Sequence, residues 1–473
     1  MSGFRARFTG APCPPPVSLE QRTVTATQLT ADTRMIAART FILRRPTLLA
    51  AAVCLVSFAG FWMAQRASHV SMIDLMVYRA EGATVRNGGD LYEMRATYAN
   101  LPTTYPPFAA LMFMPLTWIG VGGMRAVATV ANLGLLVALV HLSLRLTGRP
   151  AKLPAAAVTL AVASVAVWCE PVWTTLRYGQ INLLLAVLVL WDLTRRAGHR
   201  WAGFGTGIAA GIKLTPALFA VLLAVAGVAL GWRRLRRGHS PWNPHLRRAA
   251  VAVITFVGTV AMAAVALPHD SRRFWTEMLF AADRVGFGED TANQSLRGIF
   301  ARALHTGDPG SGWLLAAAVV GCAGLAVSVA ALLAGDRLPY NVAWATLACA
   351  VTALLVSPIS WSHHWVWGVP MVILLGTEAL RRRDALWAAG AALVGLLFCS
   401  FMLWLVPHGA GRFELGQSGG QMALSAVYPA IGAAFLAVTG TVAFQAFRND
   451  PRRRRSTPVL SSRRAAAYDY VNR

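Results

Sequence analysis

Six short polar clusters interrupt an otherwise apolar sequence, and they hold most of the side chains that could do chemistry. The first contains Asp74 and Tyr78, just after a long apolar run. A carboxylate at a membrane boundary is costly unless it is paired or used, and its pKa is open to tuning. Asp74 is therefore either a functional carboxylate or a charge at a helix N-terminus, where the helix dipole stabilises it.

The second and third clusters contain groups that suit a sugar or a phosphate. Tyr105 precedes two prolines that fix a turn and start a helix. This segment either contacts a substrate or has only that structural role. The polar side chains of the third cluster are Glu170, Arg177, Tyr178, Gln180 and Asn182. Tyr, Gln and Asn side chains can hydrogen-bond sugar hydroxyls, whereas Arg binds phosphate. Hydrogen bonding between neighbouring helices is the alternative.

Lys213 forms the centre of the fourth cluster and is one of only two lysines in the chain. It lies at a break between two apolar runs, shortly before a proline that can start a helix. A cation beside a helix N-terminus suits a lipid phosphate, and a snorkelling side chain is the alternative. The fifth cluster, Asn293-Gln294-Ser295, matches a glycosylation sequon, a pattern that is frequent by chance. The alternative is that this cluster lines a site.

The sixth cluster places His363 and His364 between Trp361 and Trp365. Tryptophan is common at membrane interfaces, but this preference does not account for the histidine pair. Neither a DxD nor an HExxH motif occurs, so the sequence predicts no metal site. Imidazoles that bind phosphate or transfer protons fit the pattern better.

The composition predicts that these clusters are carried by a helical membrane protein. The chain has 473 residues, of which 56% are hydrophobic and 14% are charged, whereas soluble domains have about 25% charged residues. Hydropathy predicts an all-α polytopic protein with about twelve transmembrane helices. They lie at residues 46–66, 123–146, 153–169, 181–194, 201–213, 214–231, 249–268, 311–335, 338–356, 364–380, 385–406 and 421–446. Residues 106–120 are apolar but short and proline-rich, which predicts a surface or re-entrant helix.

Charge fixes the expected orientation. The net charge is +24, and the arginines gather in short loops between apolar runs, as the positive-inside rule requires. This placement argues against nucleic-acid binding. Both termini are therefore expected in the cytoplasm, with residues 1–45 and 447–473 as disordered tails. Loops 67–122, 269–310 and 407–420 are expected on the outer face, where the polar clusters converge.

Taken together, the clusters resemble those of the polyprenol-phosphate-mannose-dependent mannosyltransferases of glycosyltransferase family 87, and most of all its actinobacterial members that extend phosphatidylinositol mannosides. The resemblance covers about residues 46–446 and rests on the Asp74 segment, RYGQIN, GIKLTP, NQSLRG and SPISWSHHW in this order. It implies a GT-C transmembrane catalytic domain in the plasma membrane, with its active site on the periplasmic face. It also implies inverting α-1,2 transfer of mannose from a polyprenyl-phosphate donor to a phosphatidylinositol mannoside, without a metal or other cofactor.

The resemblance also implies roles for the residues. Asp74 would be the general base, while Lys213, Arg177 and either His363 or His364 would offset charge on the donor phosphate. The other expected substrate contacts are Tyr78, Tyr105, Glu170, Tyr178, Gln180, Asn182, Asn293, Gln294, Ser295, Trp361 and Trp365.

Several alternatives stay open. Within the same class, the chain could branch lipomannan or lipoarabinomannan, or transfer arabinofuranose from a decaprenyl-phosphate donor. A transporter would carry inverted repeats and polar groups at the bilayer midplane, and neither is found. A purely structural membrane protein would leave Asp74, Lys213 and the histidine pair unexplained. The sequence does not determine the oligomeric state.

Overall fold

The computed structural model describes residues 45–148, 153–196 and 198–449, and the predicted tails lie almost wholly outside this part. The regular secondary structure of the described chain is helical except for one small hairpin, in which β1 (Arg95–Ala96) pairs antiparallel with β2 (Leu101–Pro102). The expectation of an all-α polytopic membrane protein is confirmed. The last helix runs to Arg448, two residues beyond the predicted domain boundary.

The first helix spans Arg45–Ala67. The α-helices that follow are α2 (Ile73–Arg86), α3 (Pro107–Phe113), α4 (Val121–Leu146), α5 (Ala155–Ala166), α6 (Glu170–Tyr178), α7 (Asn182–Leu193), α8 (Phe204–Ile212), α9 (Ala217–Leu235), α10 (Pro244–Ala266), α11 (Pro268–Arg273), α12 (Leu296–Ala303), α13 (Gly312–Ala334), α14 (Asn341–Val356), α15 (Gly368–Arg382), α16 (Ala385–Cys399), α17 (Gly419–Ser425) and α18 (Val427–Arg448). Short 3-10 or π turns are η1 (Met114–Trp118), η2 (Phe274–Met278), η3 (Ala282–Val285), η4 (Gly335–Arg337), η5 (Ser362–Trp367), η6 (Met402–Leu405) and η7 (Phe413–Gly416).

Helices occur at all twelve predicted spans, but not all of them are long enough to cross a bilayer. Within the described residues, six helices are long and apolar enough to cross a membrane, namely the first helix, α4, α9, α10, α13 and α18. The pair α5 and α6 adds a seventh if it counts as one span, with a bend of 77°. The helices α7, α14 and α16 are apolar but shorter. Asn182 begins α7 and Ser357 follows α14, so polar residues interrupt both of these apolar runs.

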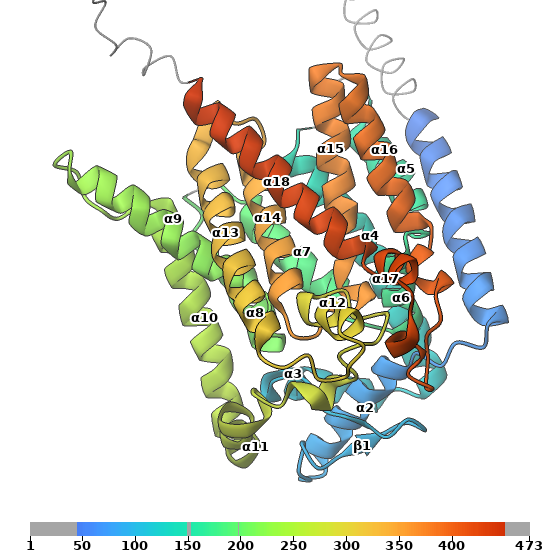
Figure 1. The fold of residues 1–473 in the computed structure, drawn as a ribbon. Coiled ribbons are helices and arrows are strands. Elements are labelled where there is room, and N and C mark those ends of the chain that lie inside the picture. Colours follow the sequence, from blue (N-terminus) through green and yellow to red (C-terminus); the bar gives the residue numbers. More distant parts are fainter. Residues whose placement is uncertain (1–44, 149–152, 197, 450–473) are drawn as a thin grey trace, which may run out of the picture.

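The two ends of the bundle differ (Figure 1). The short elements α2, α3, α11 and the β hairpin gather at one end, which is at the bottom of the view. The first helix begins, and α18 ends, at the opposite end. Residues 107–118 form a short apolar helix, of which α3 packs against α2 and α10. That it lies at the membrane surface or is re-entrant stays a prediction.

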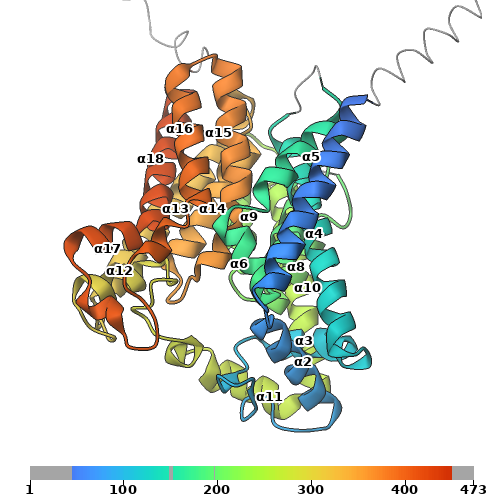
Figure 2. The same ribbon diagram turned by 90° about the vertical axis from the view of Figure 1, so that its right-hand side faces the viewer.

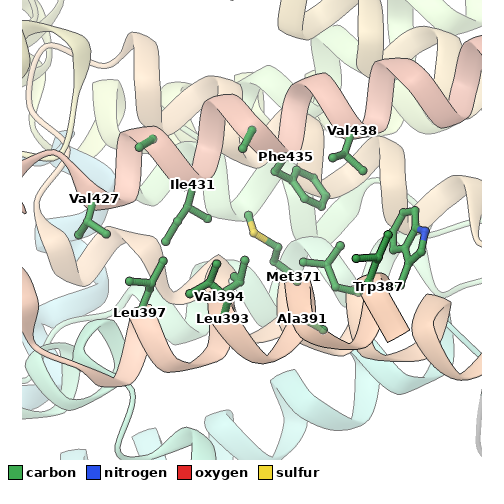
Figure 3. A pocket seen from close by; sticks show the side chains of 15 residues that line it. Met371, Trp387, Ala391, Leu393, Val394, Leu397, Val427, Ile431, Phe435 and Val438 are labelled. Atoms are coloured by element: carbon green, nitrogen blue, oxygen red, sulfur yellow. The ribbon is translucent and has the colours of Figure 1, made fainter. Parts of the chain in front are cut away.

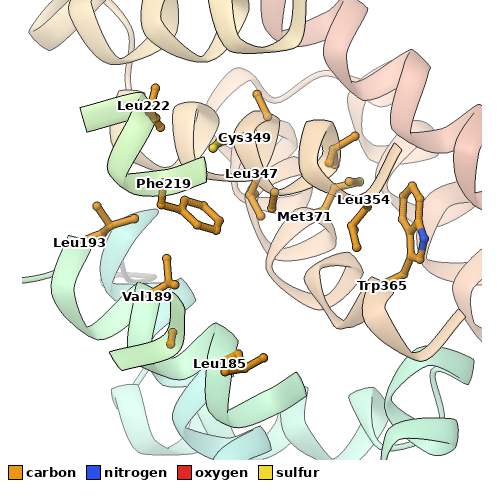
Figure 4. Close-up of a cluster of buried hydrophobic side chains, with 14 of the residues drawn as sticks. Leu185, Val189, Leu193, Phe219, Leu222, Leu347, Cys349, Leu354, Trp365 and Met371 are labelled. Atoms are coloured by element: carbon orange, nitrogen blue, oxygen red, sulfur yellow. The ribbon is translucent and has the colours of Figure 1, made fainter. Parts of the chain in front are cut away.

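The bundle is held together by a large apolar core (Figure 4), in which Trp365, Phe219 and Met371 lie on different helices. Small residues allow the helices to approach closely. A Cβ added at Gly207 of α8 would lie 2.5 Å from the Cβ of Thr255 on α10. Small side chains at such contacts are typical of membrane helix pairs. This packing fixes the end of α8, where Lys213 follows as the C-cap residue.

Candidate active site

A cavity of about 450 Å³ lies where the polar clusters meet, at the end of the bundle that carries α2. Asp74 enters it from the first turn of α2, whose N-cap residue Met72 has a left-handed backbone with φ 51°. The other predicted site residues that line the cavity are Tyr78, Tyr105, Gln180, Lys213, Trp361 and His364. These residues come from five separate segments, so only the folded bundle assembles them.

Asp74 is held by the segment that follows α6. Gly179 ends α6 with φ 70°, and a Cβ there would lie 2.6 Å from the Cβ of Leu75. A glycine is therefore required both for the left-handed turn and for the close approach to α2. This approach brings Gln180 to Asp74, where its Nε2 donates a 2.7 Å hydrogen bond to Oδ2.

The orientation of the Gln180 amide is fixed by two tyrosines. Its Oε1 accepts hydrogen bonds from the hydroxyls of Tyr78, at 2.8 Å, and Tyr105, at 3.2 Å. Because Oε1 is occupied as an acceptor, the Nε2 donor must face Asp74. Among the described residues Asp74 has no hydrogen-bond partner besides Gln180, so Oδ1 remains for a ligand hydroxyl.

Burial sets the basicity of Asp74. It raises the pKa of this carboxyl to about 6, and the hydrogen bond from Gln180 and the charge of Lys213 reduce the shift. A carboxylate with this pKa is largely ionised at neutral pH, yet it is a stronger base than an exposed aspartate. A general base works best when its pKa lies near the working pH.

Lys213 is the cation nearest to this network. Its Nζ lies 2.9 Å from Nε2 of His364 and 3.5 Å from Oδ1 of Asn182, and it is 5.4 Å from the ring centre of Tyr105. Burial lowers the pKa of Lys213 to about 8, although Asp74 opposes the shift. A buried amine without a paired carboxylate is suited to an incoming anion.

The histidine pair divides into one cavity residue and one buried residue. His364 lines the cavity, and its Nδ1 accepts the backbone N–H of Trp361 at 3.1 Å. Burial, reinforced by Lys213, holds the pKa of His364 well below its usual range. His363 is only 5% exposed and packs against the Tyr178 ring, and its Nε2 finds no partner in the described chain. Of the two, His364 is therefore the one placed to meet a ligand.

One charged residue of the cavity lining was not predicted from the sequence. Arg284 lines the cavity and donates hydrogen bonds to the carbonyls of Thr103 and Thr104. Nothing in the sequence distinguishes it from Arg272 or Arg297 in the same loop. Only the path of that loop across the cavity reveals its position.

Glu81 is a second unpredicted feature, two turns after Asp74 on the same side of α2. It is fully buried, and neither of its carboxyl oxygens has a partner in the described residues. Burial raises the pKa of Glu81 to about 8. It is therefore mostly protonated at neutral pH, and it lies outside the cavity lining, so Asp74 is the ionised carboxylate of the site.

Glu170 was expected to contact substrate, but the structure gives it a different position. It is fully buried, and its carboxyl group accepts hydrogen bonds from four side chains. The donors are Thr174, Ser362, Trp404 and Tyr428, at 2.7, 2.8, 3.0 and 2.8 Å. Oε1 accepts three of these hydrogen bonds and Oε2 accepts one, so the carboxyl group joins four segments, and Glu170 is not among the residues that line the cavity.

Asn293, Gln294 and Ser295 are also buried and hold loops together. Oδ1 of Asn293 accepts the backbone N–H of Ser360, and Gln294 donates to the carbonyl of Ser425. Ser295 caps α12 by accepting the N–H of Gly298. Asn293 is 0% exposed, so the sequon is closed to glycosylation in this fold. The cluster supports the loop that carries the histidines and does not line the cavity.

The remaining predicted contacts lie around the cavity. Arg177 and Tyr178 are partly exposed at the end of α6 and are not among its lining residues. Trp365 is buried against Tyr428. Asn182 donates to the carbonyl of His363, and it faces a smaller neighbouring cavity of about 70 Å³ together with Lys213 and His364.

A second large cavity has no groups for chemistry. It measures about 500 Å³ and lies between α15, α16 and α18 (Figure 3). Its labelled lining residues are apolar apart from the indole nitrogen of Trp387. Such a groove suits hydrocarbon, so the polar cavity at Asp74 is the candidate active site.

Comparisons with known proteins identify similar sequences. The model of glycosyltransferase family 87 matches residues 104–358. A protein of Mycobacterium tuberculosis (strain CDC 1551 / Oshkosh) is 36% identical over 343 residues, covering 71% of this chain and 72% of the relative. It is named a polyprenol-phosphate-mannose-dependent alpha-(1-2)-phosphatidylinositol pentamannoside mannosyltransferase.

Two further proteins are similar. A polyprenol-phosphate-mannose-dependent alpha-(1-2)-phosphatidylinositol mannoside mannosyltransferase of Mycolicibacterium smegmatis (strain ATCC 700084 / mc(2)155) is 34% identical, covering 68% of this chain and 74% of the relative. A crystal structure of ArnT from Cupriavidus metallidurans bound to undecaprenyl phosphate aligns with a TM-score of 0.41 and 14% identity, covering 84% of this chain and 77% of that chain.

Proposed function

The chain belongs to glycosyltransferase family 87, and from this premise we propose that it transfers mannose from a polyprenyl-phosphate mannose to a mannose hydroxyl of a phosphatidylinositol mannoside, in α-1,2 linkage. The relatives that are 31–36% identical over about 70% of the chain carry names with this donor and this class of acceptor. The bundle would then be a GT-C catalytic domain.

One observation carries the mechanism: Asp74 and Lys213 line the same cavity. The acceptor hydroxyl attacks the anomeric carbon of the donor mannose while the bond from that carbon to the phosphate oxygen breaks. The hydroxyl proton passes to Asp74, and the bonding electrons leave with the phosphate, whose charge rises from one to two. Lys213 stabilises this added charge, because a fixed cation acts most strongly where charge develops.

The residues around Asp74 support its role as a base. Gln180 fixes one carboxylate oxygen at 2.7 Å and leaves the other for the acceptor. Asp74 is the only carboxylate among the described lining residues. A single carboxylate suits a direct displacement with inversion, in which no covalent glycosyl-enzyme forms. Tyr78, Tyr105 and Trp361 provide hydroxyl and ring surfaces for sugars.

We propose that the active site lies on the periplasmic face of the plasma membrane. The start of the first helix and the end of α18 would then both lie on the cytoplasmic side. The support is the arginine bias of the loops together with the shape of the bundle. The first helix begins and α18 ends at the end opposite to the cavity (Figure 1). Lipid-linked sugar donors are then used on the side that carries the outer loops.

The test is a transfer assay with purified protein, labelled polyprenyl-phosphate mannose and a panel of phosphatidylinositol mannosides. We expect one labelled product that an α-1,2-specific mannosidase releases. Transfer only from a polyprenyl-phosphate arabinose, or only to lipomannan or lipoarabinomannan, would replace the proposal with one of the alternatives. A product with retained donor configuration would contradict the single displacement.

A further inference from the structure

A separate polar cavity of about 420 Å³ lies beside the active site. It is formed by the end of the first helix, the segment leading into α2 and the first turns of α4. Figure 2 shows the first helix, in blue, descending beside α4 towards α2. The lining residues are Trp62, Gln65, Arg66, His69, Val70, Met72, Gly122, Arg125, Ala126 and Thr129. None of them belongs to the proposed catalytic machinery.

The charge of this cavity is entirely basic. Arg66 and Arg125 both line it, and its ten lining residues include no carboxylate. Nε of Arg125 is buried without a partner, and the structure shows no ion pair for either guanidinium among the residues it describes. His69 adds an imidazole at the rim. Two unpaired guanidinium groups in one cavity attract an anion that carries oxygen acceptors.

Gln65 provides independent support for a ligand. Its side chain is only 8% exposed and lines the cavity, yet neither Oε1 nor Nε2 has a hydrogen-bond partner in the described chain. Burying an amide without hydrogen bonds is costly, so such groups are normally satisfied by protein, water or ligand. The amide N–H adds a neutral donor to the two cations.

The surroundings indicate that the anion belongs to a lipid. The large apolar side chains Met63, Val127 and Val130 next to the cavity are exposed. Both helices that carry them are long and apolar enough to cross a membrane. The cavity lies where these helices end, which is the depth of lipid headgroups. A lipid could place its phosphate among the arginines and its acyl chains along the apolar helix faces.

We propose that this cavity binds the phosphodiester of the glycolipid acceptor. This inference rests on the proposed function, which supplies the acceptor. Met72 lines this cavity as the N-cap residue of α2, and Asp74, two residues later, lines the active site. A lipid held by its phosphate at Arg66 and Arg125 would therefore have its sugars beside the base. The donor phosphate has its own cation in Lys213, so the two phosphates occupy separate cavities.

The test uses a variant with both Arg66→Gln and Arg125→Gln. Removing two charge-assisted contacts should raise the KM for a phosphatidylinositol mannoside at least tenfold. The rate with an alkyl mannoside acceptor, which has no phosphate, and the KM for the donor should stay within about twofold. Arg272→Gln is the matched control, because Arg272 is exposed at the same end of the molecule and does not line the cavity.

Other outcomes would overturn the proposal. An unchanged KM for the glycolipid would do so, as would an equal rise for the alkyl mannoside or a rise for the donor instead. If the double variant does not fold, Arg66→Gln alone gives the same test, because the Arg66 side chain is exposed. Gln65→Glu, which places a negative charge at the buried amide, should also raise the glycolipid KM.

A binding measurement separates this proposal from the proposed function. Purified protein is titrated with a fluorescent phosphatidylinositol mannoside, with phosphatidylglycerol as competitor. Weaker binding by the double variant supports the site even if the wild type transfers no mannose, in which case only the proposed function fails. Equal competition by phosphatidylglycerol would assign the cavity to bulk anionic lipid and overturn its assignment to the acceptor.

Discussion

The amine of Lys213 lies 2.9 Å from Nε2 of His364, while Nδ1 of the same ring accepts the backbone N–H of Trp361. A neutral imidazole carries one proton, so in this arrangement the proton is on Nε2 and points at the amine. The imidazole therefore does not stabilise the ammonium form of Lys213. The contacts that stabilise the ammonium form are the hydrogen bond to Oδ1 of Asn182, at 3.5 Å, and the ring face of Tyr105. This form is short of acceptors until an anion enters the cavity.

The shifted pKa values of Asp74 and Lys213 predict a bell-shaped dependence of kcat/KM on pH. Asp74, with its pKa raised to about 6, must be deprotonated, so activity should rise with pH through about 6. Lys213, with its pKa lowered to about 8, must be protonated, so activity should fall above about 8. In Lys213→Arg the guanidinium stays charged, and the alkaline limb should disappear from whatever activity remains. An alkaline limb that is unchanged in this variant would assign that titration to another group.

We predict that Asp74→Asn abolishes transfer while the protein stays folded and binds donor. Asparagine keeps the size and the hydrogen bond to Gln180 but cannot accept a proton at neutral pH. Loss of a general base costs about 100- to 10,000-fold in rate. Transfer and melting temperature should be measured on the same purified variant. Turnover within about tenfold of the wild type, well short of that range, would exclude Asp74 as the base.

Two cations that looked equivalent in the sequence should differ in their effect on donor binding. Lys213→Ala should weaken donor affinity about 10- to 100-fold, because it removes a buried charge-assisted contact to phosphate. Arg177→Gln should change it less than threefold or so, since Arg177 does not line the cavity. Titration with a non-transferable donor analogue measures both. Equal losses in the two variants would mean that the donor phosphate extends beyond this cavity.

Glu170→Gln should lower stability rather than substrate affinity. The carboxyl group accepts four hydrogen bonds, and glutamine would turn an N–H group towards donors. We expect a loss of about 2 kcal/mol or more in the free energy of unfolding. Scanning calorimetry in detergent and the KM values of both substrates test this. Glu277→Gln is the control, since its side chain is 61% exposed. A changed KM with unchanged stability would show that Glu170 contacts substrate, as the sequence had predicted.

The orientation can be tested by labelling in intact cells, starting from a variant in which the six native cysteines are replaced. A cysteine at Tyr98, which is 86% exposed in the β hairpin loop, should react with an impermeant maleimide. A cysteine at His239, between α9 and α10, should react only after lysis. The reverse pattern would place the cavity in the cytoplasm.

The sequence by itself determined the helical membrane class and most of the residues at the centre of the site. Asp74, Lys213 and the pair His363 and His364 were identifiable because each is a costly polar group at the boundary of an apolar run, but the sequence did not show which histidine lines the cavity. Hydropathy is a local property, so it located helices at all twelve predicted positions. It was less accurate about their lengths: α16 ends at Cys399, well before the predicted residue 406, whereas α9 and α10 are each longer than predicted.

Only the tertiary structure decided which polar side chains share the cavity. Glu170 and Arg177 belong to the same short helix as the residues that lead to Gln180, yet one is enclosed by four donors and the other lies outside the lining. Arg284 enters the cavity from a loop whose arginines look alike in sequence. The physical reason is that residue type and spacing fix the cost of burying a group. The rotation of each helix and the path of each loop are fixed by packing between distant segments, and these determine whether that group meets a partner or a ligand.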